Sequence, residues 1–140
     1  MSVSSTGRPG NNESFQPAIS ENVRYVAFGS LASSLVPGDT KETEDVFVRD
    51  RKRRTTRRVS VSSTGRPGNS ESRLPAISAD GRYVAFSSEA SNLVPGDTNS
   101  AADVFSADRF HDRPIAGPRY AALMVVTPGS GRVCRPCQIL

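Results

Sequence analysis

The chain has 140 residues, which is enough for one ordinary domain and too short for two. It contains 11 glycines and 10 prolines but no tryptophan, a composition that favours short strands joined by turns over long helices. The formal charge of +4 does not indicate a general attraction to nucleic acid, because the cations gather at 49–58 and in the C-terminal tail while the rest is acidic. No apolar run approaches the length that spans a bilayer, so we expect no membrane partner.

The sequence repeats itself with a period of 58 residues. Ser2–Arg51 aligns with Ser60–Arg109 without a gap, and about 35 of the 50 positions are identical. The ten letters SVSSTGRPGN open both copies. A fixed period of this length indicates repeated structural units. The chain therefore divides into copy one at 2–59, copy two at 60–109 and an unmatched tail at 110–140.

Each copy begins with a series of short strands. We expect Met1–Ser5 to form a stray strand, and the letters PAIS followed by RYVAF predict a hairpin in each copy. In copy two the turn contains Asp80 and Gly81, and glycine supplies the positive φ that a tight hairpin needs. Copy one has Asn22 and Val23 there, so we expect a less comfortable turn. In RYVAF the apolar residues occupy both faces, which predicts a strand buried on both sides.

Two further strands complete copy one, DVFVRD at Asp45–Asp50 and TTRRVSVSS at Thr55–Ser63, with a basic turn between them. Copy two repeats the first of these and then departs from the pattern. The apolar segment Tyr120–Val126 can take the place of the fourth strand. We therefore predict two antiparallel four-stranded sheets. Such a sheet cannot bury both faces alone, so the sheets should stack as neighbouring blades of a β-propeller.

The motif PAISADGRYVAFSS at Pro75–Ser88, together with DVFVRDR and RRVSVSS, resembles the WD40-like repeat of TolB-type β-propellers. The resemblance covers 1–109, although the Ser-x-Asp-Gly core is complete only in copy two, at Ser78, Asp80 and Gly81. It implies an all-β fold of antiparallel four-stranded propeller blades, followed here by an irregular C-terminal tail. Members of this family usually carry about six blades and act as non-catalytic binding platforms, often in the periplasm or outside the cell; some are fused to peptidase domains.

The sequence has no recognisable catalytic constellation. His111 is the only histidine, and it lies in the tail without a neighbouring nucleophile or carboxylate pattern. Phosphate-binding glycine motifs, the nucleophile elbow and the zinc-protease helix motif are absent from the sequence. We therefore predict that the chain is not an enzyme.

The best metal candidate is the loop DTNSAAD, where Asp97, Asn99 and Asp103 stand at positions one, three and seven, as oxygen ligands do in calcium loops. Ala101 stands at position five and no glutamate completes the pattern, which counts against the site. Copy one has a lysine in place of Asn99, and a lysine opposes cation binding. The alternative is that these side chains shape a turn. Calcium is the one candidate cofactor.

The basic run RDRKRRTTRR lies between two expected strands, so we interpret it as an exposed hairpin turn. Aromatic residues that could stack on bases are not interleaved with it, which argues against nucleic acid as a partner. Cys134 and Cys137 have the spacing of a redox or zinc pair, but a single Cys-x-x-Cys leaves their role open.

Two blades leave one face of each sheet uncovered, and exposed apolar faces mark interaction surfaces. We therefore predict a non-catalytic propeller module that binds a protein partner or assembles with itself. Three copies would supply about six blades, with the Met1–Ser5 strand of one copy at the edge of another. The alternatives are a fragment of a peptidase propeller domain and a truncated product with no selected role. Met1 aligns with Val59, inside a unit, so we expect a longer reading frame upstream.

Overall fold

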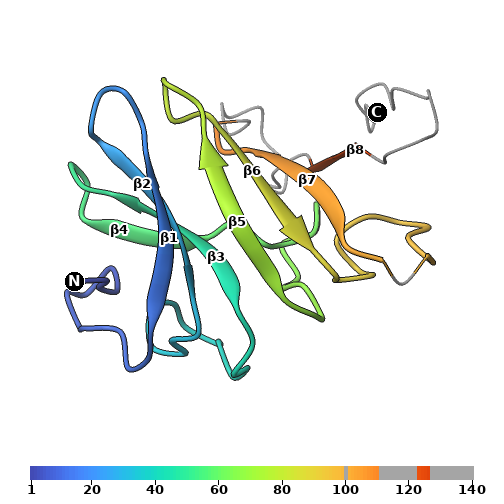
Figure 1. Ribbon diagram of the computed structural model, residues 1–140. Helices are drawn as coiled ribbons and strands as arrows, with labels where there is room; N and C mark the ends of the chain where they lie inside the picture. The colour runs from blue at the N-terminus through green and yellow to red at the C-terminus, as the bar shows by residue number, and fades with distance from the viewer. Residues whose placement is uncertain (100, 111–122, 127–140) are drawn as a thin grey trace.

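The computed structural model describes residues 1–99, 101–110 and 123–126. The described residues form β-strands and no helix, which confirms the predicted all-β fold (Figure 1). None of them belongs to a helix that could cross a membrane. The strands are β1 (Ser14–Ile19), β2 (Tyr25–Ser30), β3 (Asp45–Asp50), β4 (Thr55–Arg58), β5 (Ser72–Ile77), β6 (Tyr83–Ser88), β7 (Asp103–Asp108) and β8 (Leu123–Val126).

The strands form two antiparallel four-stranded sheets, in the orders β1-β2-β3-β4 and β5-β6-β7-β8. Each strand therefore pairs with its neighbour in the sequence, and copy two repeats the register of copy one: Tyr25 lies opposite Asp50, and Tyr83 opposite Asp108. The expected replacement for the fourth strand is confirmed at Leu123–Val126, which pairs with β7. The rest of that apolar segment, 120–122, lies outside the described residues.

The segment after β4 is a loop, whereas the sequence predicted a strand as far as Ser63. Ser62 closes a turn on Arg66: its N–H donates to the Arg66 carbonyl at 2.8 Å, and its hydroxyl accepts from the Arg66 N–H at 3.1 Å. The identical letters at Ser4 and Arg8 form the same two bonds, at 2.8 and 3.1 Å. The prediction of a stray strand at Met1–Ser5 is therefore wrong, because serine side chains there close a turn.

The hairpin between the first two strands forms in both copies. Gly81 has a φ of +75°, as the sequence predicted, and Val23 takes the equivalent left-handed conformation with a φ of +57°. A β-branched residue is strained in this region. The turn is nevertheless held, because the Ser20 hydroxyl donates to Asn22 Oδ1 at 2.7 Å, and Asp80 accepts the equivalent bond in copy two. The strain expected in copy one is therefore located at Val23.

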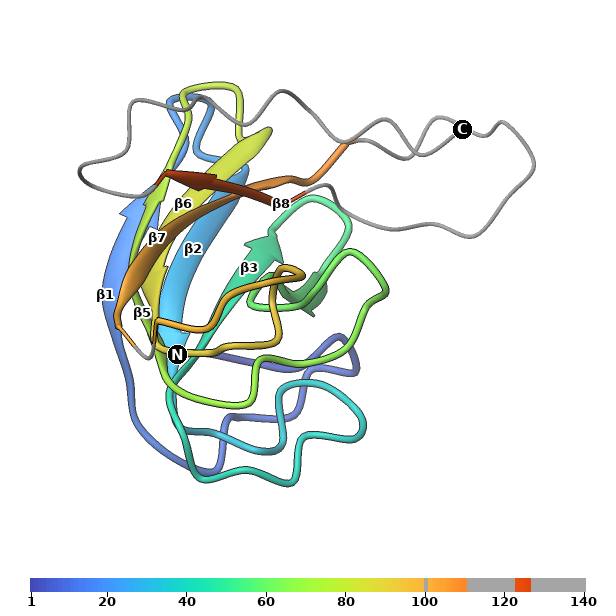
Figure 2. The same cartoon turned by 90° about the vertical axis from the view of Figure 1, so that its right-hand side faces the viewer.

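The two sheets stack face to face as neighbouring propeller blades. β5 packs against β1, β2 and β3, and in Figure 2, which looks onto the second sheet, the first sheet lies behind it. The RYVAF strand of copy one is buried on both sides, as predicted. Tyr25 and Ala27 belong to the core between the sheets, whereas Phe28 packs in a separate cluster with Phe47 and Leu35.

Candidate binding faces

Each blade has two faces, because successive side chains of a strand point to opposite sides. We call one the Tyr face; it is made in the first blade by Tyr25, Ala27, Val46 and Val48 and in the second by Tyr83, Ala85, Val104 and Ser106. We call the other the Phe face; it is made in the first blade by Val26, Phe28, Phe47 and Arg49 and in the second by Val84, Phe86, Phe105 and Ala107. The Tyr face of the first blade packs on the Phe face of the second.

Tyr25 is the central contact of this internal interface. The Arg109 guanidinium lies 4.3 Å from the centre of the Tyr25 ring, and the Phe110 ring meets it edge-on at 5.7 Å. Burial lowers the pKa of Arg109, although the group stays charged. Gly81 leaves room for the ring: a Cβ at residue 81 would lie within 2.9 Å of three of its ring atoms. The interface thus joins a tyrosine ring to an arginine and a glycine of the next blade.

Backbone bonds also join the two blades. The Ser72 N–H donates to the Glu44 carbonyl at 2.8 Å, and the Glu21 N–H donates to the Ala79 carbonyl at 3.0 Å. These groups belong to turns and strand ends, so the bonds fix the relative position of the sheets. A blade that docks in the same way needs both the apolar faces and these edges.

Within 1–99, 101–110 and 123–126, no second sheet covers the Tyr face of the second blade. Tyr83 is 44% exposed and Val104 is 46% exposed, whereas the equivalent Tyr25 and Val46 are 4% and 0% exposed. The same residue types in the same register are therefore buried in the blade that has a described neighbour and exposed in the blade that has none. Their exposure leaves apolar surface in water, which is the usual mark of an interaction surface.

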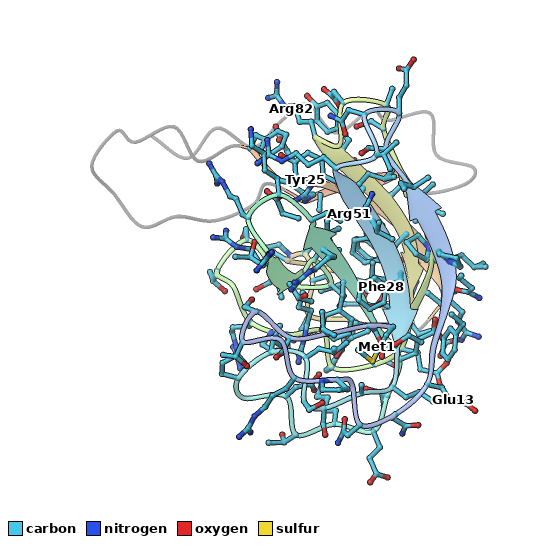
Figure 3. The ribbon with its side chains drawn as sticks, turned by 90° about the vertical axis from the view of Figure 1, so that its left-hand side faces the viewer. Met1, Glu13, Tyr25, Phe28, Arg51 and Arg82 are labelled. Carbon is cyan, nitrogen blue, oxygen red and sulfur yellow. The ribbon has the colours of Figure 1, made fainter. Side chains whose placement is uncertain are left out.

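The Phe face of the first blade opens onto a cavity of about 530 Å³. Figure 3 looks onto this side and shows the labelled Arg51, Phe28 and Met1 following one another along β2. The apolar part of the lining includes Phe28 and Val26, and three arginines add positive charge: Arg49, Arg51 and Arg54. The cavity therefore combines an apolar surface with cations, a lining that suits an apolar partner carrying acidic groups.

A buried arginine occupies the calcium-like loop of copy one. Arg58 Nη2 lies 2.7 Å from Asp39 Oδ2, and Arg58 Nη1 lies 3.4 Å from Asp45 Oδ2. The Ser60 hydroxyl donates to Asp45 Oδ1 at 2.7 Å. Burial raises the pKa of the Asp45 carboxyl, and the nearby Arg58 opposes that rise. A guanidinium therefore balances the charge that a metal ion would balance in such a loop.

In copy two the register position of Arg58 is taken by Val125 of β8. Asn99 Nδ2 donates to Asp103 Oδ2 at 3.1 Å, and Asn99 Oδ1 accepts from a backbone N–H two residues later at 3.0 Å. Such bonds shape a turn. Among the described residues, no three His, Cys, Asp or Glu side chains lie close enough together to hold a metal ion. Calcium binding by Asp97, Asn99 and Asp103 stays a prediction.

The turn between β3 and β4 is exposed at 51–54, where the sequence predicted a solvated turn. Asp50 organises it. The Arg24 guanidinium donates to this carboxylate, with Nη2 at 2.8 Å from Oδ2, and the N–H groups of Lys52 and Arg53 donate at 3.0 Å. The bonds from Arg24 and the backbone lower the pKa of Asp50 to about 2. Part of the basic run therefore packs around a carboxylate of its own blade.

Comparison with solved structures shows what this chain is similar to. No family model matches the sequence, and no curated protein matches it. The chain is similar to the crystal structure of TolB from Acinetobacter baumannii, with a TM-score of 0.43 and 14% sequence identity. The similarity covers 89% of this chain and 28% of that chain, so this chain spans less than a third of the length of TolB. The propeller fold stated above rests on the order and stacking of the two sheets.

Two residues distinguish the Phe-face side of the first blade from that of the second, and the sequence motifs indicated one of them only as a poor turn residue and the other not at all. Val23 stands where copy two has Gly81, and Arg49 stands where copy two has Ala107. A comparison of the two copies, position by position, would have found the second difference as well. Two other predicted features are not placed: His111 and the Cys-x-x-Cys pair lie outside the described residues.

Proposed function

We propose that this chain is a non-catalytic β-propeller module of the TolB-type WD40-like family, which binds protein through its uncovered blade faces. The observation that supports the proposal is the difference between two equivalent tyrosines. Tyr25 is 4% exposed beneath a second blade, whereas Tyr83 is 44% exposed. The Tyr face of the second blade keeps a tyrosine, an alanine and a valine at the positions that the first blade uses for packing, so a polypeptide with a complementary sheet face can bury it as the second blade buries the first. The occupant is a partner protein or a further copy of the chain.

The proposal is tested by the apolar surface that the folded chain offers. We expect the chain to bind an apolar fluorescent dye while it shows a cooperative thermal transition. The change Val104→Lys, on the uncovered Tyr face, should reduce dye binding without lowering the melting temperature, because Val104 is already 46% exposed. Thr64→Lys, at an exposed position of the loop that opens copy two, should leave dye binding unchanged. A folded chain of single-chain mass that binds no dye would contradict the proposal.

A further inference from the structure

The internal interface is a template for how a second copy of this chain could dock. The uncovered Tyr face of the second blade keeps Tyr83, Ala85 and Val104 at the positions that the first blade uses for docking. No second sheet lies on the Phe face of the first blade, which keeps Val26 and Phe28 as counterparts of Val84 and Phe86. Phe28 is already 7% exposed, because it packs with Leu35 of its own blade. Two copies could therefore meet head to tail, and contacts of this kind continue into rings or filaments. The faces are complementary at all of these positions.

One difference obstructs that docking at the centre of the contact. In the internal interface the Tyr25 ring lies against Gly81, where a Cβ would come within 2.9 Å of three ring atoms. The first blade has Val23 at this position, in the same hairpin and with the same left-handed backbone. Arg51 is placed as Arg109 is, because its Nη1 donates to the Val23 carbonyl at 2.9 Å, as Arg109 donates to the carbonyl of Gly81. The Val23 side chain therefore occupies the space that a Tyr83 ring would need.

A second difference places a cation where the internal interface is apolar. Ala107 is 1% exposed in the core between the blades. Its counterpart in the first blade is Arg49, whose Nη1 donates to the Ser4 carbonyl at 3.0 Å and to Thr56 Oγ1 at 3.1 Å. The Tyr face laid over this guanidinium would remove water from its other N–H groups, and the apolar residues Ala85 and Val104 of that face supply no side-chain acceptor in exchange. Both differences disfavour the docking of a second copy on the first blade.

We propose that Val23 and Arg49 prevent a second copy of this chain from docking head to tail on the first blade. This inference rests on the proposed function, since it concerns which protein the Phe face of the first blade accepts. The two residues act as specificity determinants: one excludes the tyrosine ring by its volume, and the other excludes an apolar sheet by its charge. The Phe face of the first blade therefore stays available to other proteins, while copies of this chain do not polymerise through it.

The test transfers the residues of the second blade to the first. The chains compared are the 140-residue wild type, Val23→Gly, Arg49→Ala and the double variant, measured by sedimentation velocity over a series of concentrations. We expect the weight-average mass of the double variant to rise with concentration from that of one chain to that of two or more. The wild type should show no such rise, and the single variants should lie between. Val23→Gly removes a strained residue, so it alone carries the test if Arg49→Ala lowers the melting temperature below that of the assay.

The control removes the ring that is expected to dock. Tyr83→Ala, added to the double variant, should return the mass to that of one chain, because Tyr83 fills the space opened at residue 23. The inference is overturned by a folded double variant that does not associate, by association that Tyr83→Ala does not reverse, or by wild-type association that Tyr83→Ala removes. Failure of this inference can be distinguished from failure of the proposed function. A wild type that binds apolar dye supports the binding faces even where the double variant stays single.

Discussion

Gly81→Ala should destabilise the chain more than a glycine substitution with the same backbone strain elsewhere. Gly81 and Gly96 both have left-handed backbones, with φ values of +75° and +82°. A Cβ at Gly96 would meet no atom within 4 Å, whereas a Cβ at Gly81 would meet the Tyr25 ring. The pair therefore separates the cost of the backbone from the cost of the clash between the blades.

The expected magnitudes follow from those two contributions. A Cβ in the left-handed region costs about 1–2 kcal/mol, and the lower entropy of the unfolded alanine chain offsets about 0.4–1 kcal/mol of it. We therefore expect Gly96→Ala to lower the free energy of unfolding by about 1 kcal/mol. Gly81→Ala adds the displacement of a packed ring, at about 1–3 kcal/mol, for a total of about 2–4 kcal/mol.

Urea unfolding followed by circular dichroism measures both losses, provided that the transitions are cooperative and their slopes are equal. The change Tyr25→Ala closes a double-mutant cycle, because it removes the ring that the new methyl group would strike. In the Tyr25→Ala background, Gly81→Ala should cost no more than Gly96→Ala, which gives a coupling of about 1–3 kcal/mol between residues 25 and 81. Equal costs for the two glycine substitutions in the wild-type background would refute the reasoning about Val23 as well, since both arguments use the same contact.

Three further predictions concern charged groups. Arg58→Met should lower the free energy of unfolding by about 3–5 kcal/mol, because it leaves buried carboxylates without a cation. The loss should grow as pH rises and those carboxylates ionise, so a loss that does not change with pH in urea titrations would count against the prediction. Asp50 has a folded pKa of about 2, below its unfolded value of about 3.9, so the stability it contributes is present above pH 4 and is lost as pH falls toward 2. Asp50→Asn should thus cost about 1–2 kcal/mol at pH 7 and little at pH 2, and Asp108→Asn should cost less at pH 7 because its arginine partner is more exposed. Calcium at about 10⁻³ M should raise the melting temperature of the wild type, and Asp97→Asn should abolish the rise; unchanged melting of the wild type would end the calcium hypothesis.

The sheet architecture could be predicted because local pattern and turn chemistry agree in both copies. Asp80 and Gly81 marked a hairpin, and RYVAF marked a strand with two apolar faces. The hairpin at Val23 was harder to predict, since the residue is poor for its backbone. It forms because the Asn22 side chain accepts the bond that Asp80 accepts in copy two. The hydrogen bond to the Asn22 side chain thus outweighs the unfavourable backbone conformation of Val23.

Other features could not be predicted because they depend on tertiary contacts. Arg58 is one of seven cations between 49 and 58, and nothing in that run indicates that it is buried against Asp39 and Asp45. The sequence also predicted β4 to be too long. The residues VSVSS have the alternation of a strand, but in the structure Ser62 forms two hydrogen bonds with Arg66 and closes a turn. The roles of Val23 and Arg49 appear only when the second blade shows which residues a docked face requires.

The loop that opens each copy has a consequence for how such a chain can change in length. Residues 2–10 and 60–68 hold the same shape, with the N–H of Gly10 bonded to the Ser2 carbonyl at 2.9 Å and that of Gly68 to the Ser60 carbonyl at 3.0 Å. Because the junction carries its own conformation, a 58-residue segment could be gained or lost by recombination without a new linker having to evolve. The number of units in such a chain is then limited by what covers its terminal sheets.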